Sequence, residues 1–300
     1  MKRSSGFQHG SALLLIFWAL LVMTTATLGW ALWVQQGIQT QGERNRGIEA
    51  RSMAHSGLAV GLHPLVSPKT PALEKEILPG MRYRVKILSE GGRLNVNWLL
   101  RGEDPQKLAI LKQWLALRGL DLHQREVFMD CLLDWVDADN IRRLNGAEDE
   151  ADYHPPNREL QSVEEIAQVR GAGPLISQPD WKDDLTIFSR GPIDLSAAPA
   201  RILNLIPGIG ETRIERFVKY RQGPDGIDGT ADDVEFANEG ELQAALGLTA
   251  QQYQEISGLV TFKDPTMHIT SEGYSGNVDR QVEVVVRKGT GTPKILSWKE

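Results

Sequence analysis

An uncharged apolar run at residues 11–34, SALLLIFWALLVMTTATLGWALWV, constrains the fold more than any other feature of the chain. The run has 24 residues, and at about 1.5 Å of rise per residue a helix of that length extends roughly 36 Å. The hydrocarbon core of a bilayer is about 30 Å thick, so the run is long enough to cross it. Backbone polar groups in lipid must be paired within the segment, which favours an α-helix. Trp30 and Trp33 near its far end are typical of the interfacial aromatic belt.

The ten residues before the run, MKRSSGFQHG, contain Lys2 and Arg3 and no acid. By the positive-inside rule this end stays in the cytoplasm and the remainder is exported. A cleaved secretory signal is disfavoured, because its apolar core has only about 7–15 residues. Two interpretations stay open from the residues alone: a plain signal anchor, and a prepilin-type leader that ends at Gly10 and is cut before Ser11.

Composition excludes several classes of protein. A hydrophobic content of 41% and a charged content of 24% are typical of a globular chain. The net charge of −6 disfavours a nucleic-acid binder. The single cysteine, Cys131, permits no intrachain disulfide and is expected to be a small buried residue. HExxH, GxSxG, Walker and Rossmann patterns are absent from the sequence, so we do not expect an enzyme.

Periodicity predicts one long helix, then strands, then a helical block, then strands. Ala54, Leu58 and Leu62 are spaced four apart, so the membrane helix should continue to residue 63 and lay one face on a domain. Residues 64–79 are expected to form a loop. Alternation predicts strands at residues 81–90, 93–97, 268–274, 280–287 and 293–299. Helical spacing occurs at residues 105–119, 124–136, 163–169 and 200–205, and Ser162/Glu165 and Thr249/Gln252 are candidate capping boxes.

Several motifs together carry a family resemblance. They are the leader ending at Gly10 and the segments GGRLNVN (91–97), LLDWVDAD (132–139), NGAEDEADY (145–153), NRELQSVEEIAQVRG (157–171), IDLSAAPARILNLIPGIG (193–210) and the C-terminal VEVVVRK and ILSWKE. In order and spacing they resemble the type II secretion minor pseudopilins of the K class, over nearly the whole chain. Most pilins and pseudopilins have Glu at the fifth mature position; here cleavage after Gly10 puts Leu15 there, which is itself a K-class trait. The mature chain would start with Ser11 where Phe is usual, which leaves N-methylation of Ser11 undecided.

The resemblance implies an α+β fold: a pilin-like long N-terminal transmembrane helix packed on an antiparallel sheet, with a large all-helical domain inserted between strands. The implied segments are a leader (1–10), the N-terminal helix (11–63, transmembrane 11–34), the first part of the α+β domain (64–98), the inserted helical domain (99–257) and the C-terminal strands (258–300).

The resemblance also implies a non-enzymatic role. Such proteins cap the pseudopilus tip with minor pseudopilins of the I and J classes, and help initiate pseudopilus assembly and export across the outer membrane. The other implied partners are the major pseudopilin filament, the inner membrane and the prepilin peptidase, with no nucleic acid. The chain would be a single-pass inner-membrane protein with a cytoplasmic N-terminus and a periplasmic C-terminal domain.

A first acidic cluster begins near the end of the helix expected at residues 124–136 and continues into the segment after it. It comprises Asp134, Asp137, Asp139, Glu148, Asp149, Glu150 and Asp152. Calcium takes six to eight oxygen ligands in flexible geometry, and the turn at Asn145-Gly146 could return the later acids toward the earlier ones. Composition alone favours a solvated acidic loop partly neutralised by Arg142 and Arg143. The K-class resemblance, whose members look like calcium binders in the helical domain, favours calcium with Asp134, Asp137, Asp139, Glu148, Asp149 and Asp152 as ligands.

A second acidic cluster lies in DGIDGTADD at residues 225–233. Asp225, Asp228, Asp232 and Asp233 alternate with glycines that permit tight turns. The segment resembles a calcium loop, although it is not the EF-hand pattern. An ordinary Asp-Gly turn loop is the other interpretation.

The segment Pro207-Gly208-Ile209-Gly210 resembles the hairpin of a helix–hairpin–helix motif. Such motifs bind DNA phosphates through backbone N–H groups at a helix N-terminus, and four basic residues follow here: Arg213, Arg216, Lys219 and Arg221. The alternative function is therefore a membrane-anchored DNA-binding or uptake protein. A structural hairpin is favoured, because the chain is acidic overall and K-class motifs surround the segment.

Overall fold

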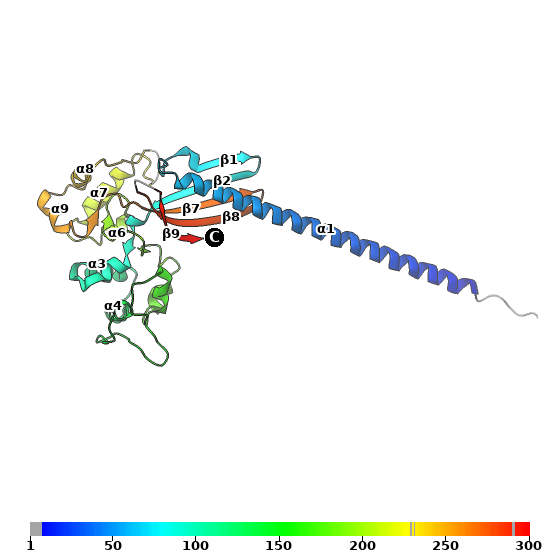
Figure 1. The fold of residues 1–300 in the computed structure, drawn as a ribbon, viewed down its shortest axis with the longest axis horizontal. Coiled ribbons are helices and arrows are strands. Elements are labelled where there is room, and N and C mark those ends of the chain that lie inside the picture. Colours follow the sequence, from blue (N-terminus) through cyan, green and yellow to red (C-terminus); the bar gives the residue numbers. More distant parts are fainter. Residues whose placement is uncertain (1–7, 229, 231, 290–291) are drawn as a thin grey trace, which may run out of the picture.

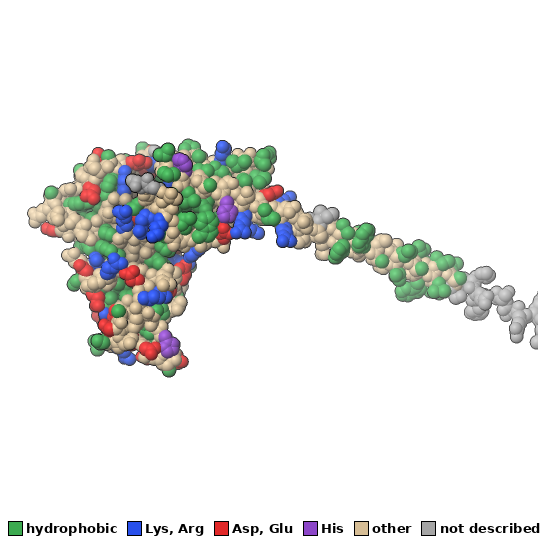
Figure 2. Space-filling model, in the orientation of Figure 1, with side chains coloured by type: hydrophobic (Ala, Val, Ile, Leu, Met, Phe, Trp, Pro, Cys, Tyr) green, Lys and Arg blue, Asp and Glu red, His purple; other side chains and the backbone are tan. Residues whose placement is uncertain are grey.

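A single helix of 55 residues, α1 (Gln8–Leu62), dominates the architecture. The computed structural model describes residues 8–228, 230, 232–289 and 292–300 (Figure 1). The N-terminal part of α1 projects from a globular part, and Figure 2 shows apolar side chains along it. Among the described residues one helix segment, Ala12–Leu62, is long and apolar enough to span a membrane, and none of its most apolar window is buried. The backbone at Gly10 and Ser11 is helical, whereas residues 1–7 of the expected leader lie outside the described residues.

The C-terminal part of α1 packs on a five-stranded antiparallel sheet with the order β1-β2-β7-β8-β9. The strands are β1 (Glu74–Leu78), β2 (Met81–Ser89), β7 (Thr266–Ser275), β8 (Val278–Arg287) and β9 (Lys294–Lys299). Ala54 and Leu58 of α1 are buried against Val85, Ile269 and Val284. The expected helix-on-sheet arrangement is therefore confirmed, and the i, i+4 apolar face is the one that is buried.

Gly273 lets the helix and the sheet approach closely. A Cβ built on Gly273 would lie 2.0 Å from Ala50 O and 2.2 Å from Ala54 N. Ser271 Oγ donates to Ala54 O at 2.7 Å, and Ser275 Oγ donates to Glu49 Oε2 at 2.6 Å. Small residues on β7 thus bring the α1 backbone within hydrogen-bonding reach.

The sequence between β2 and β7 forms a second unit, which we call the helical module, with a buried core that runs from Leu94 to Val260. Its helices are α2 (Val96–Leu100), α3 (Pro105–Leu117), α4 (Leu122–Val136), α5 (Gly173–Ile176), α6 (Ala200–Leu203), α7 (Glu211–Arg221), α8 (Glu239–Leu246) and α9 (Ala250–Ile256). Two short parallel ladders join distant segments: β3 (Leu94–Asn95) with β4 (Leu185–Thr186), and β5 (Ile193–Asp194) with β6 (Val260–Thr261). The first and the last residues of the module are therefore each paired with its middle segment, residues 185–194.

Three local predictions were wrong. Residues 64–79 contain the edge strand β1, which pairs with β2 although its side chains are all exposed, so no alternation marked it. The strand expected at 93–97 ends at Asn95, because the Asn95 side chain accepts from Trp98 N and starts α2.

The capping box expected at Ser162 and Glu165 does not form. Ser162 makes no capping bond and residues 163–168 form a 3₁₀ helix, whereas Glu165 accepts from Gln161 N. The capping box of Thr249 with Gln252 is confirmed.

Candidate functional site

The end of α4 and the loop after it gather three of the predicted ligands. Carboxylate oxygens of Asp134, Asp137 and Glu148 all lie within 4.8 Å of one another. Asp134 lies in the last turn of α4 and Asp137 is its C-cap, so both project from the helix end. Gly146 brings the returning loop close, since a Cβ there would lie 1.9 Å from Asp134 Oδ2. The turn at residues 145–146 therefore brings Glu148, but not Asp149, back to Asp134 and Asp137.

Glu148 is the member of this cluster whose charge is least compensated. Its side chain is 6% exposed. Neither of its carboxylate oxygens, nor Asp137 Oδ1, has a hydrogen-bond partner within the described part of the chain. Burial, reinforced by the charges of Asp134 and Asp137, raises the pKa of Glu148. Buried carboxylate oxygens without partners are costly, and a cation is the group that would satisfy several of them together.

Arg143 already neutralises part of the cluster. Its Nη1 lies 2.5 Å from Asp134 Oδ1 and also contacts Asp137 Oδ2, while Nη2 lies 2.7 Å from Glu103 Oε1. Burial opposes the charged form, but the hydrogen bonds to Asp137 and Asp134 raise the pKa of Arg143. Asp134, Asp137 and Glu148 therefore fit a hard cation by donor type and proximity, and such an ion would compete with Arg143 for two of them.

The other predicted ligands of this segment lie outside the cluster. Asp139 accepts from Ile141 N at 2.8 Å in a local turn. Asp149 lies 2.5 Å from His154 Nδ1 and is exposed, and Asp152 is also exposed. The structure thus brings together half of the six expected residues of the first cluster.

The second acidic loop gathers Asp225, Asp232 and Asp233, whose carboxylate oxygens lie within 4.8 Å of one another. Asp232 Oδ2 accepts from Asp225 N at 3.0 Å, and its Oδ1 accepts from Thr230 Oγ1 at 2.7 Å. The hydrogen bond from Thr230 lowers the pKa of Asp232. This loop is more exposed than the first cluster, and its members are mostly held by hydrogen bonds within the loop.

Asp228 does not join the other three acids of that loop. It accepts from Arg221 Nε at 3.2 Å and Nη2 at 3.1 Å. Arg221 is 5% exposed and donates to Ala198 O at 2.8 Å, so this pair anchors the loop to the interior of the helical module. Arg221 is accordingly turned away from any surface that could meet DNA.

The predicted helical hairpin lies between α6 and α7. Gly208 and Gly210 both have φ of +85°, a conformation suited to glycine, and Ile209 between them is 2% exposed. Arg213 and Arg216 follow on α7, where Arg216 Nε donates to Thr212 O at 3.3 Å. The hairpin is thus a tight turn with a buried apolar apex.

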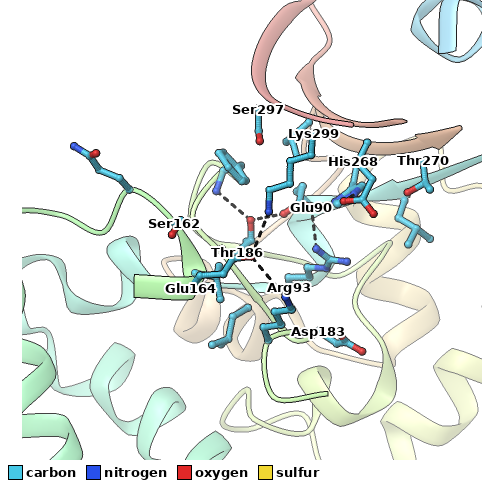
Figure 3. A pocket seen from close by; sticks show the side chains of 18 of the residues that line it. Glu90, Arg93, Ser162, Glu164, Asp183, Thr186, His268, Thr270, Ser297 and Lys299 are labelled. Carbon is cyan, nitrogen blue, oxygen red and sulfur yellow. Dashed lines mark hydrogen bonds and ion pairs between the residues drawn. The ribbon is translucent and has the colours of Figure 1, made fainter. Parts of the chain in front are cut away.

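A cavity of about 500 Å³ lies where the sheet meets the helical module (Figure 3). Glu90, 1% exposed, sits at its edge with His268 Nδ1 at 2.9 Å and Arg93 Nη1 at 3.1 Å, and accepts from Thr186 Oγ1. Burial alone would raise the pKa of Glu90, but His268, Arg93 and Thr186 hold it below its usual value. Lys299 Nζ of β9 lies 3.2 Å from Glu164 of the module. These contacts fasten the two units to each other.

Sequence reasoning missed the buried acids Glu90, Asp184, Asp194 and Asp264, which are all at most 3% exposed. Asp194 Oδ2 accepts from Asp264 N at 2.6 Å, and Asp264 Oδ2 accepts from Arg190 N at 2.8 Å. No local pattern distinguishes these carboxylates from solvated ones, because the contacts that join them to the interior, such as Asp194 with Asp264 N and Glu90 with Thr186, link segments distant in the sequence. The one available signal was IDL at residues 193–195, an acid between two apolar residues.

Comparisons with known proteins agree with this fold. Residues 92–178 match the family model for the type II secretion system protein K, first domain. The type II secretion system protein K of Dickeya chrysanthemi is 35% identical over 69 residues, which are 22% of this chain and 20% of that protein. The aligned segment thus spans a fifth of the length of the curated relative.

A solved structure resembles nearly the whole chain. It is the crystal structure of the GspK-GspI-GspJ complex from the enterotoxigenic Escherichia coli type 2 secretion system, with a TM-score of 0.59 and 14% identity over 87% of this chain and 98% of that one. At this identity the likeness establishes the pilin-like fold. The family match covers α2 to α5, and the fold match extends over 87% of this chain. The chain is thus similar to the type II secretion system protein K family over residues 92–178 of its helical module, and it has a pilin-like fold.

Proposed function

We propose that this protein is the minor pseudopilin at the tip of a type II secretion pseudopilus, where it helps to initiate assembly and export across the outer membrane. The observation that carries the proposal is α1, which is exposed and apolar at its N-terminal end and packed on the sheet at its C-terminal end. The role is structural, and the inner membrane holds the chain before assembly. The comparisons give no support to the DNA-uptake alternative.

Leu15 supports the tip position. In other subunits the Glu at this position meets the N-terminal amine of the neighbour above, as the family resemblance implies. A subunit with no neighbour above has no partner for that carboxylate, and a lone carboxylate in hydrocarbon is costly. Leu15 is 71% exposed on α1, so its side chain would face lipid or a neighbouring helix.

The proposed partners are the I-class and J-class minor pseudopilins, by analogy with the complex that includes GspI and GspJ. The full chain, extracted in detergent, should co-purify with both at physiological salt. Retention on DNA under the same conditions without those partners would favour the uptake function, because non-specific DNA binding falls steeply with salt.

Processing by a prepilin peptidase gives the first prediction. We expect cleavage between Gly10 and Ser11, because the basic leader directly adjoins the apolar run. The mass of the membrane-extracted protein should correspond to a chain starting at Ser11, and Gly10→Ala should be tolerated better than a bulky residue. An intact Met1, or a start beyond Val34, contradicts the prediction.

Leu15→Glu is expected to impair insertion and tip placement. An acid at the centre of a membrane helix costs roughly 2.5–3.5 kcal/mol on insertion scales, and less near the interface. Secretion and recovery of the I-class and J-class partners should both fall. Leu15→Gln is the control that adds polarity without charge and should have the smaller effect. Equal secretion by wild type and Leu15→Glu would argue against the tip position.

We further propose that calcium binds the first acidic cluster. Asp134, Asp137 and Glu148 would supply the side-chain oxygens, and the ion would neutralise the carboxylate of Glu148. Calcium favours carboxylate oxygens in flexible geometry, whereas magnesium demands near-octahedral geometry and retains its waters. The support is the set of buried oxygens of Glu148 and Asp137 that have no partner in the described part of the chain.

Calcium is therefore expected to raise the melting temperature of the protein. At a hundredfold excess over Kd an ion that binds only the folded state stabilises it by about 2.7 kcal/mol. For a domain of this size that corresponds to a shift of about 5–10 °C. Melting should be compared in EDTA, calcium and matched magnesium, with magnesium substituting poorly.

Variants locate the calcium effect. Glu148→Gln and Asp137→Ala should each remove much of the shift, whereas Asp149→Ala, an exposed acid outside the cluster, should retain it. Asp225→Asn should remove a separate part if the second loop also binds an ion. Identical melting of the wild type in EDTA and calcium would contradict both metal proposals without affecting the family assignment.

A further inference from the structure

A groove of about 600 Å³ runs between α7 and α8 in the helical module. We call it the α7–α8 groove, lined by Arg213, Arg216, Tyr220, Phe236, Ala245 and Leu246 among others. Figure 1 shows α8 and α9 at the end of the globular part that lies away from the projecting end of α1. The α7–α8 groove therefore lies far from the membrane-spanning part of α1 and would stay accessible to a partner while α1 is in a membrane.

The floor of the groove is apolar, and the side formed by α8 carries small residues. Phe236 stacks on the buried Phe217 at a centroid distance of 5.6 Å, and Leu246 is 1% exposed. Ala244, Ala245 and Gly247 on the α8 side are small, so a large side chain could approach the backbone there. The groove can therefore take one bulky apolar side chain against a fixed aromatic ring.

The α7 rim is basic and aromatic. Arg213, Arg216 and Tyr220 follow at i, i+3 and i+7, so they share one face of α7, which adjoins the face of the buried Ile214 and Phe217. Tyr220 is 56% exposed and its ring lies 6.4 Å from that of Phe236. Arg213 Nη1 lies 3.5 Å from Gln252 Oε1, and Arg216 Nε donates to Thr212 O. Within the described part of the chain, neither Arg213 nor Arg216 pairs with a carboxylate.

One acid, Glu241, also lines the groove, but its carboxylate is engaged at the start of α8. It accepts from Ala237 N at 2.8 Å and from Asn238 Nδ2 at 3.3 Å. Two guanidiniums that have no carboxylate partner among the described residues thus lie beside an apolar floor, in a chain whose net charge is −6. Charge complementarity favours an anionic ligand, and the floor requires that ligand to carry an apolar group.

We propose that the α7–α8 groove binds an acidic segment of another protein that carries a bulky apolar side chain. The apolar side chain enters between Tyr220 and Leu246 and packs on Phe236, and flanking carboxylates accept from Arg213 and Arg216. Arg, Tyr and Phe are the residue types enriched at such contacts. A nucleic acid fits less well, because two arginines are few for a polyanion and the acidic chain would repel it.

Binding can be measured by fluorescence anisotropy with the detergent-solubilised full chain and a labelled peptide, acetyl-EELFEE-amide. At low salt we expect saturable binding with a Kd below about 1 mM, weakened by added salt. Acetyl-KKLFKK-amide and acetyl-EEGGEE-amide should bind much more weakly, because the first carries positive instead of negative charge and the second lacks the bulky apolar side chains. A single-stranded oligonucleotide that binds more tightly than EELFEE would overturn the proposal.

Charge-reversing variants place the binding on this groove. Arg216→Glu should weaken EELFEE binding about tenfold, since it removes a charge-assisted contact and adds repulsion. Lys219→Glu is the matched control: it is exposed on the same helix but does not line the groove, and its affinity should match wild type. Tyr220→Ala should also weaken binding, while melting temperatures report whether each variant is folded. Equal loss in Arg216→Glu and Lys219→Glu, no loss in either, or self-association of the chain through this face would contradict the proposal.

Discussion

Gly273→Val is expected to separate the C-terminal part of α1 from the sheet. A Cβ at this position would lie 2.0 Å from Ala50 O and 2.2 Å from Ala54 N, and both are backbone atoms of a helix that cannot yield locally. Overpacking typically lowers the free energy of unfolding by 1–3 kcal/mol. Because this clash is with backbone atoms, we expect a loss of about 3 kcal/mol or more. The displaced helix would also lose the hydrogen bond from Ser271 Oγ to Ala54 O.

Thermal melting and limited proteolysis of the full chain in detergent measure this effect. A loss of about 3 kcal/mol corresponds to a fall of about 6–12 °C in melting temperature for a domain of this size. Cleavage within residues 46–62, protected in wild type, should become rapid. Gly42→Val is the control, because a Cβ on Gly42 meets nothing within 4 Å. Unchanged protection of residues 46–62 in Gly273→Val would show that the helix does not depend on this close contact.

The second large effect is expected from Asp184→Ala in the core of the helical module. Asp184 is 3% exposed. Its Oδ2 accepts from Trp114 Nε1 at 3.1 Å and Arg118 Nη2 at 2.7 Å, and its Oδ1 accepts from Arg201 Nε at 2.6 Å. Removing one partner of a buried charge network typically costs 3–5 kcal/mol. Here Trp114 Nε1 would lose its buried acceptor, whereas Arg201 is 59% exposed and Arg118 also contacts Asp180, so we expect a loss of about 3 kcal/mol. The variant should therefore melt well below wild type at neutral pH.

The pH dependence of that difference follows from the pKa of Asp184. Burial opposes ionisation, but the hydrogen bonds from Trp114, Arg201 and Arg118 hold the pKa below the usual Asp value. A depressed pKa in the folded state contributes stability that is fully present above the unfolded pKa of about 3.9. It is lost as pH falls through the folded pKa.

The gap in unfolding free energy between wild type and Asp184→Ala should thus be constant from pH 7 down to about 5 and shrink in stronger acid. Denaturant titrations at a series of pH values measure it. Asp183→Ala, which removes an exposed acid at the neighbouring position, should show little loss at any pH. A wild-type advantage over Asp184→Ala that grows on acidification would contradict the assigned sign.

The sequence by itself determined the elements whose burial follows from local periodicity. The run at 11–34 required a membrane-length helix, and the spacing of Ala54, Leu58 and Leu62 identified the face that packs on the sheet. Alternation located β2 and β7, because in a half-buried strand every second side chain faces the core. The sequence pattern also located β8, which buries three consecutive residues, and the edge strand β9, which is partly exposed throughout. The edge strand β1 escaped prediction, and all five of its side chains are exposed.

Only the tertiary structure decided which acids meet. Ten Asp and Glu residues were candidate ligands from the sequence and its K-class resemblance. The fold gathers Asp134, Asp137 and Glu148 in one place and Asp225, Asp232 and Asp233 in another. Asp228 pairs with the buried Arg221, and Glu90 and Asp184 lie inside networks assembled from distant segments. Periodicity reports which face of an element is buried, whereas convergence of loop carboxylates depends on the path of the backbone between elements. In this protein that path rests on contacts such as Gly146 against Asp134, which no local pattern encodes.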